Sequence, residues 1–247
     1  MTGQTPIKLA YVRFTSCSGC QLMLLNCEEQ LAQLAGLVAL REFPLACSDA
    51  LEGQFLDLAL VEGSISTAAE LTRLLELRRR CRLLVAVGSC ALNGGINALV
   101  EDNRDAASTL VYGPSLPCTD SFPPLPLHRF VKVDWRISGC PPERHELVET
   151  LTALLRGGWP GWQVMPVCME CRILERRCLL QEDRLPCLGP VTRAGCRARC
   201  PSLGVPCEGC RGMVAEANRD QLFRLLVENG LAEGEIERRL QRFGGEP

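Results

Sequence analysis

The sequence lacks the features that nucleic-acid-binding and membrane proteins need. Only two of its 27 basic residues are lysines (Lys8 and Lys132), and the formal net charge is −2. The concentrated basic excess of a nucleic-acid surface is therefore missing. No apolar run approaches the roughly 20 residues that span a bilayer, and no basic region precedes an apolar stretch at the N-terminus. These absences predict a soluble, cytoplasmic protein with no membrane span and no nucleic-acid partner.

Common catalytic and nucleotide-binding patterns are missing as well. His128 and His145 are the only histidines in the sequence, and no Ser/His/Asp set can be assembled around them. Neither GxGxxG nor GxxxxGK occurs, so no dinucleotide or P-loop site is expected. We expect both histidines to be solvated or packed, and we assign no catalytic residue to this chain.

Cysteine, by contrast, is abundant, with 16 residues in a chain of 247. The chain is 47% hydrophobic and 23% charged, so it can bury a sizeable core. In a reducing compartment, cysteines at this density more often hold metal or do redox work than form disulfides. Secretion would make disulfides a serious alternative.

The first 158 residues have the pattern of an α/β domain. Short apolar runs bounded by turn residues predict strands, and they alternate with helical periodicity, which predicts a parallel sheet with crossover helices. The predicted strands are residues 7–14, 55–63, 82–90 and 131–140, and the predicted helices are residues 22–34, 67–80 and 143–155.

This pattern stops near residue 158. Between Cys168 and Cys210 the sequence is rich in Cys, Pro, Gly and Arg and has little periodicity, and residues 212–243 are helical again. We therefore expect a second domain over residues 159–247, small and irregular, with C-terminal helices. Its cysteine-rich segment has too little apolar matter to fold unless metal holds it.

Three of the predicted strands end in cysteine motifs, which are Cys17-Ser-Gly-Cys20, Gly88-Ser-Cys90 and Gly139-Cys140-Pro-Pro. Parallel strands end at one edge of a sheet, so we expect these four thiols to gather there. Four thiolates on a rim of small residues suit a tetrahedral metal or a cubane iron–sulfur cluster. A lone CxxC would equally suit a redox pair. The placement of cysteine motifs at three strand ends is therefore what indicates a metal or cluster site.

The second region has eight cysteines, or two sets of four. Sequential division gives one set from Cys168 to Cys187 and another from Cys196 to Cys210. An interleaved arrangement, as in two-cluster ferredoxins, is equally compatible with the spacing. Zinc would suit the same twelve positions, although zinc knuckles usually draw their ligands from local pairs, unlike the strand-end set. Spacing alone favours iron–sulfur clusters over zinc, and both over disulfides.

The motifs SCSGCQ, AVGSCALNGG and SGCPP, in this order, resemble those that ligate the proximal cluster in the small subunit of nickel–iron hydrogenases. The stretch RCLLQEDRLPCLGPVTRAGC, followed by PCEGC, resembles the segment that carries the two outer clusters of that family. The resemblance covers about residues 7–212. It is strongest to the cytoplasmic, multi-subunit branch, in particular to the delta subunit of sulfhydrogenases and related NADP- or viologen-linked enzymes.

The resemblance implies three [4Fe–4S] clusters with four cysteine ligands each. The implied ligands are Cys17, Cys20, Cys90 and Cys140 for the proximal cluster, Cys168, Cys171, Cys178 and Cys187 for the distal one, and Cys196, Cys200, Cys207 and Cys210 for the medial one. Many periplasmic relatives have His where Cys168 stands and Pro near Cys200, where a three-iron cluster results. Cys200 supplies a fourth thiolate here. The export signal and membrane anchor of those relatives are also missing.

The family further implies a flavodoxin-like first domain and a division of labour between subunits. Hydrogen would be split at a nickel–iron site in the large subunit. This chain would relay electrons from there, in the order proximal, medial, distal, to a flavin-bearing or iron–sulfur partner of the diaphorase type. The terminal acceptor, whether NADP, NAD, ferredoxin or polysulfide, is left open.

Other functions remain open at this stage. A complex-I-like subunit would carry one cluster and an adjacent cysteine pair, so the CxxC and the eight later cysteines argue against it. A zinc-stapled interaction module and a stand-alone ferredoxin-like carrier are further alternatives.

Several cysteines and one glutamate fall outside the implied sets. Cys27 is expected to be an ordinary buried thiol on the helix after CxxC, and Cys47, Cys81 and Cys118 have no assigned role. Glu62, in VEGS at a strand end, could lie near the proximal cluster or cap a turn.

Overall fold

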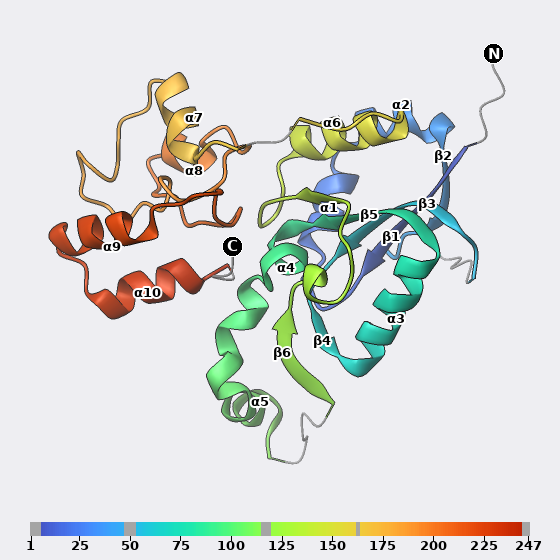
Figure 1. The fold of residues 1–247 in the computed structure, drawn as a ribbon, viewed down its shortest axis with the longest axis horizontal. Coiled ribbons are helices and arrows are strands. Elements are labelled where there is room, and N and C mark those ends of the chain that lie inside the picture. Colours follow the sequence, from blue (N-terminus) through green and yellow to red (C-terminus); the bar gives the residue numbers. More distant parts are fainter. Residues whose placement is uncertain (1–5, 47–52, 115–119, 162–163, 244–247) are drawn as a thin grey trace.

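The computed structural model describes residues 6–46, 53–114, 120–161 and 164–243. Within these residues, five strands form one parallel sheet in the order β2-β1-β3-β5-β7 (Figure 1). The strands are β1 (Ile7–Arg13), β2 (Val38–Glu42), β3 (Leu56–Glu62), β5 (Cys81–Val87) and β7 (Trp135–Ile137). Counted along the chain, the order is that of flavodoxin-like folds. The predicted α/β fold class is confirmed.

Helices cover both faces of this sheet. One face packs against α1 (Gly19–Leu25), α2 (Glu28–Leu34) and α6 (Arg144–Leu155), and the other against α3 (Ala68–Arg79) and α4 (Gly88–Asn93) (Figure 1). Along β1, Leu9 and Tyr11 point into the first core and Ala10 and Val12 into the second, as the two-residue period of a strand requires. The sheet is therefore buried on both faces.

A second, two-stranded antiparallel sheet contacts the 3-10 helix η2 (Ile96–Asn103), which leads into α5 (Arg104–Tyr112). This sheet pairs β4 (Ile65–Thr67) with β6 (Ser121–Leu125), and β4 follows β3 directly. The sequence pattern predicted neither this sheet nor β2.

The predicted elements differ from the structure mainly at their ends. The single helix expected over residues 22–34 is two helices, because Cys27 has non-helical dihedral angles at the start of α2. The strand expected over residues 82–90 ends at Val87, since Gly88 has a φ of +83° and opens α4. The strand expected over residues 131–140 is reduced to the three residues of β7.

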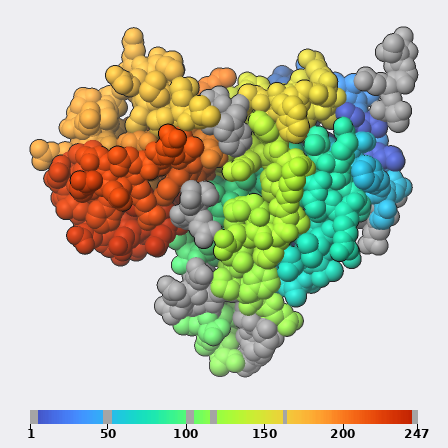
Figure 2. Space-filling model, in the orientation of Figure 1, coloured from blue at the N-terminus to red at the C-terminus, as the bar shows by residue number. Residues whose placement is uncertain are grey.

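Residues 164–243 form a cysteine-rich lobe beside the α/β domain (Figures 1 and 2). Its helices are α7 (Val167–Ile173), α8 (Arg199–Ser202), α9 (Arg219–Glu228) and α10 (Glu233–Gln241). The Asn218 side chain accepts a hydrogen bond from the Gln221 backbone at the start of α9, so the helical segment expected over residues 212–243 begins only at Arg219.

The lobe has more apolar core than its sequence suggested. Leu222 and Leu226 of α9 and Ile236 of α10 pack against Val167 and Leu188 of the cysteine-rich segment, together with Cys187 and Cys207. The C-terminal helices thus supply much of the core that the cysteine-rich segment lacks by itself, and the dependence of this segment on metal stays a prediction.

No helix in the described ranges has both the length and the apolar character needed to cross a membrane.

We predict that Leu226→Ala destabilises the cysteine-rich lobe by about 2–5 kcal/mol, because the Leu226 side chain is fully buried and its loss leaves a cavity. Denaturant unfolding of the purified protein measures this change. The neighbouring residue Val227, which is 40% exposed, supplies the control Val227→Ala. Equal destabilisation by both variants would contradict a core shared with α9.

Candidate metal centres

The carboxyl ends of β1, β5 and β7 lead into the first group of thiols. Cys17 follows β1, Cys20 lies in the first turn of α1, Cys90 lies in α4, and Cys140 follows β7. Ser18 takes a left-handed conformation at the start of α1, and Arg13 donates a hydrogen bond of 2.7 Å to its hydroxyl. The loop between Cys17 and Cys20 is thereby fixed against the end of β1.

The four thiols at this edge interact electrostatically. Burial raises the pKa of Cys20 far above its ordinary value, and the charges of Glu62, Cys90, Cys140 and Cys17 raise it further. Burial, followed by the charges of Cys140 and Cys17, raises the pKa of Cys90 to about 12. Burial and Cys17 also raise the pKa of Cys140. The structure thus brings together the four residues expected at the sheet edge, whose ligation of a cluster stays a prediction.

Glycines leave the space that these thiols occupy. A Cβ at Gly88 would overlap the Cys20 sulfur, and one at Gly95 would lie 2.7 Å from the Cys90 sulfur. Both residues have positive φ angles, at +83° and +66°, so a side chain would be strained as well as crowded. The cradle is built from backbone and small residues, as an iron–sulfur cluster requires.

Buried polar side chains lie directly beneath this group. Glu62, at the end of β3, is 1% exposed and accepts hydrogen bonds of 2.9 Å from the Tyr11 hydroxyl and the Gln21 backbone. Of the two roles considered for Glu62, the structure supports the one beside the thiols. Asn97 donates to the Cys90 sulfur at 3.6 Å. Reasoning from the sequence did not identify Tyr11, Gln21 or Asn97 as part of this site.

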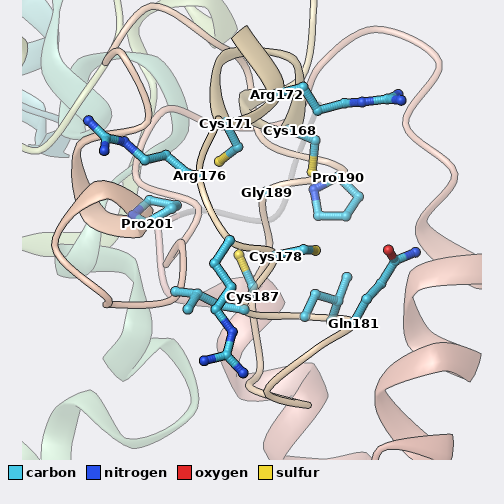
Figure 3. A pocket seen from close by; sticks show the side chains of 13 residues that line it. Cys168, Cys171, Arg172, Arg176, Cys178, Gln181, Cys187, Gly189, Pro190 and Pro201 are labelled. Carbon is cyan, nitrogen blue, oxygen red and sulfur yellow. The ribbon is translucent and has the colours of Figure 1, made fainter. Parts of the chain in front are cut away.

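The second group of thiols surrounds a cavity of about 480 Å³ in the cysteine-rich lobe. Figure 3 shows the four thiols pointing into the space between them. The cavity lining includes four cysteines and three arginines, which are Cys168, Cys171, Cys178, Cys187, Arg172, Arg176 and Arg177. Burial and the other three thiols raise the pKa of Cys168 to about 12. Gly189 leaves room here, since a Cβ would lie 3.3 Å from the Cys168 sulfur.

The third group centres on Cys210. The thiols of Cys196, Cys200 and Cys207 each interact electrostatically with that of Cys210. Burial raises the pKa of Cys196 to about 11, and the backbone N–H of Arg199 opposes this rise. Thiol charges also act across the sequential division, from Cys187 on Cys207 and from Cys196 on Cys171. The division of the eight cysteines into two sequential sets therefore stays a prediction.

Glu170 supports this third group from α7. Its carboxylate accepts hydrogen bonds from the backbone N–H groups of Gly195, at 2.8 Å, and Ala198, at 3.0 Å. The Cys196 sulfur lies 3.7 Å from the same carboxylate. A carboxylate on the helix of Cys168 and Cys171 thus orders the loop of Cys196, a contact that the sequence did not predict.

Backbone N–H groups connect the three groups. The N–H of Cys140 donates to the Cys210 thiol, and this hydrogen bond lowers the pKa that burial raises. The Ser89 hydroxyl donates to the carbonyl of Cys210. The N–H of Cys207 donates to the Cys187 sulfur at 3.2 Å. The third group therefore lies between the first and the second.

The spacing within the groups is wider than one metal ion needs. Thiolates on a single zinc lie about 3.8 Å apart, because each Zn–S bond is about 2.3 Å long and the geometry is tetrahedral. In the described part of the chain, no three His, Cys, Asp or Glu side chains converge tightly enough for one ion. The donor set and the cavity volume fit a four-iron cluster better.

The remaining cysteines and histidines lie apart from these groups. Cys27 is buried, as expected, although it lies between α1 and α2, and Cys81 is buried at the start of β5. Cys47 and Cys118 lie outside the described residues. His145 is half-buried and lies within hydrogen-bond distance, 3.1 Å, of the carbonyl of Gly195.

Residues 17–154 match the family described as NADH ubiquinone oxidoreductase, 20 Kd subunit. Over 237 residues the chain is 38% identical to sulfhydrogenase 2 subunit delta of Pyrococcus furiosus, and this match covers 96% of the chain and 99% of the relative. The match to the sulfhydrogenase subunit runs nearly end to end, so it includes the whole cysteine-rich segment between Cys168 and Cys210.

Two solved structures resemble the fold. A chain of the NAD⁺-reducing [NiFe]-hydrogenase in the H₂-reduced state is 32% identical with a TM-score of 0.55, covering 64% of this chain and 95% of that one. A [NiFeSe]-hydrogenase chain from Dm. baculatum is 20% identical with a TM-score of 0.61, covering 84% and 95%. The 84% coverage exceeds what the first 158 residues can account for, so the shared fold extends into the cysteine-rich lobe.

We predict that Gly88→Ala lowers the iron content of the protein, because the new methyl group would displace the Cys20 thiol. Iron and acid-labile sulfide per chain, measured after anaerobic purification, test this. Gly157→Ala is the matched control, since Gly157 has a similar φ of +77° but nothing within 4 Å of the added Cβ. An equal loss of iron in both variants would attribute the effect to backbone strain.

Proposed function

This chain belongs to the small subunits of nickel–iron hydrogenases, and we propose that it relays electrons between the nickel–iron site of a large subunit and a flavin- or NAD(P)-linked partner. It is a component of an oxidoreductase, and small subunits of this family pair with a large subunit. In our proposal three [4Fe–4S] clusters carry the electrons. The proximal cluster lies in a domain of residues 1–158, and the other two lie in a domain of residues 159–247.

The observation that carries this proposal is the succession of hydrogen bonds between the thiol groups. Cys140 of the proximal set donates its N–H to Cys210 of the medial set, and Cys207 of the medial set donates to Cys187 of the distal set. Iron–sulfur clusters bound to such cysteines supply one-electron carriers. These contacts from one set to the next support the order proximal, medial, distal.

The protein's own groups prepare each set for a charged metal cluster. Burial keeps the thiols protonated, so the cluster must displace their protons when it binds. The N–H donors to Cys187 and Cys210 then stabilise thiolate charge, and the apolar core around Cys207 excludes water. Reducing conditions keep the free cysteines available, so we place the complex in the cytoplasm.

Both ends of the proposed relay are exposed. Cys17 and Cys140 of the proximal set are exposed, which suits a face covered by the large subunit. At the other end, residues 172–177 are exposed around the distal cavity, which suits a face for the diaphorase-type partner.

A complex-I-like role is the second candidate, because the family match spans residues 17–154 and carries the name of a ubiquinone oxidoreductase subunit. The similarity over 96% of the chain to a sulfhydrogenase subunit favours the hydrogenase role, because it includes all eight later cysteines.

We predict that Cys140→Ala abolishes hydrogen-dependent reduction of an added acceptor by the purified complex, because the first step of the relay loses a ligand. Cys81→Ala is the control, since Cys81 is buried but belongs to no thiol group. Full acceptor reduction by the Cys140 variant would exclude the proximal assignment.

Iron analysis of the unaltered chain should give about twelve irons and as many sulfides, whereas about three zinc ions without sulfide would support the zinc-stapled alternative.

We also predict that Cys200→Pro converts the medial cluster to a three-iron form, because proline offers no ligand in place of the thiolate. Electron paramagnetic resonance of the oxidised complex would detect the three-iron signal. An unchanged four-iron count would contradict the sequential division of the eight cysteines and favour an interleaved one.

A further inference from the structure

A buried arginine lies against the medial thiols. Arg211 follows Cys210 directly, and its side chain is 2% exposed. Its guanidinium donates to the carbonyl of Ser138 at 2.7 Å and to that of Ala194 at 3.0 Å. The same group donates to both oxygens of Glu146, at 2.7 and 2.8 Å. Every nitrogen of this cation is therefore paired.

The surroundings are shaped to accept this cation. Gly195 has a φ of +121°, and a Cβ there would overlap the Arg211 guanidinium. Glu146 comes from α6 and Ser138 from the end of β7, so both partners belong to the α/β domain. The position of the charge relative to the medial thiols is set by both parts of the chain.

The guanidinium acts electrostatically on two medial thiols. Its Nε–H donates to the carbonyls of Arg193, at 3.2 Å, and Ala194, at 3.0 Å, just before Cys196 in the chain, and Arg211 itself follows Cys210 directly. Its positive charge thus favours negative charge on these sulfurs in a region with little water to screen it.

A second ion pair beside the same thiols is exposed. Arg199, next to Cys200, pairs with Glu143 at 2.9 Å, and its side chain is 62% exposed. Like the Arg211–Glu146 pair, it connects the medial segment to the start of α6. Because solvent and salt screen exposed charges, the Arg199–Glu143 pair should affect the medial thiols far more weakly than the Arg211–Glu146 pair does.

We propose that the buried Arg211 guanidinium, held in place by Glu146, raises the reduction potential of the medial cluster. This proposal rests on the proposed function, since it requires the medial ligands. One-electron reduction adds one negative charge to the cluster and its four thiolates, with no bond formed or broken and no proton transferred. A fixed positive charge at short range stabilises that reduced form. Arg211 is thus a positioning residue that acts through charge.

Redox titration of the purified hydrogenase complex, followed by electron paramagnetic resonance, tests the proposal. Arg211→Gln should lower the medial potential and change the ratio of reduced to oxidised cluster at fixed potential about tenfold, which is 59 mV for one electron. Glu146→Gln should raise the potential, because it leaves the guanidinium and removes the compensating negative charge. A purely structural role would not move the potential in opposite directions.

Two further variants serve as controls. Arg211→Lys keeps the charge and should stay closer to the unaltered potential than Arg211→Gln does. Arg199→Gln removes the exposed guanidinium and should change the ratio of reduced to oxidised medial cluster less than twofold.

Shifts of the same sign in Arg211→Gln and Glu146→Gln, or an Arg199→Gln shift as large as that of Arg211→Gln, would overturn the proposal. If Arg211→Gln does not assemble, the sign of the Glu146→Gln shift decides alone. Four-iron signals with unmoved potentials in the variants would refute only the role of the charge, whereas an unaltered complex without medial iron would refute the proposed function.

Discussion

Thiols must ionise before they can hold iron, and burial opposes that ionisation throughout this protein. Burial is the largest cause of the raised pKa at Cys20, Cys90 and Cys168, and neighbouring thiols raise each pKa further. Four thiolates in one such pocket would repel one another unless a multivalent cation lay between them. Metal binding and a stable arrangement of these loops are therefore coupled. The glycines leave room for a metal cluster between the thiols, and the N–H groups that donate to sulfur stabilise thiolate charge. Both therefore favour the ionisation that burial opposes.

This coupling acts unequally on the two parts of the chain. The α/β domain has two apolar cores, one on each face of its sheet, and its thiols lie on loops beyond the strand ends. In the cysteine-rich lobe, Cys187 and Cys207 belong to the apolar core itself, beside Leu226 and Ile236. Removal of metal should therefore loosen the lobe more than the sheet, although α9 and α10 keep part of its core in place.

The parallel sheet and the grouping of four strand-end cysteines could be predicted from the sequence because both follow from local patterns. Apolar runs of strand length identify three of the five strands well, and cysteines after β1, β5 and β7 lead to one edge. The strand predicted over residues 131–140 is only the three residues of β7, and the mixed polar β2 lacks such a pattern. Contacts at long sequence separation could not be predicted, such as Gln21 with Glu62, 41 residues apart, or Arg211 with Ser138, 73 residues apart. Nothing in CEGCR distinguishes a buried arginine from an exposed one.

In the proposed relay, contacts between the two parts of the chain hold the proximal and medial sets together. Cys210 receives hydrogen bonds from Cys140 of the proximal set and from Ser89, next to Cys90, while Arg211 binds Ser138 and Glu146. A hinge motion of the lobe would break these buried interactions together and leave the Arg211 cation unpaired. The free-energy cost would be large, because an unpaired buried charge is strongly destabilising. The separation between proximal and medial sets is thus fixed by the same residues that set the charge around them. A subunit that passes electrons between its domains needs this rigidity, because its rate depends on a distance that must not vary.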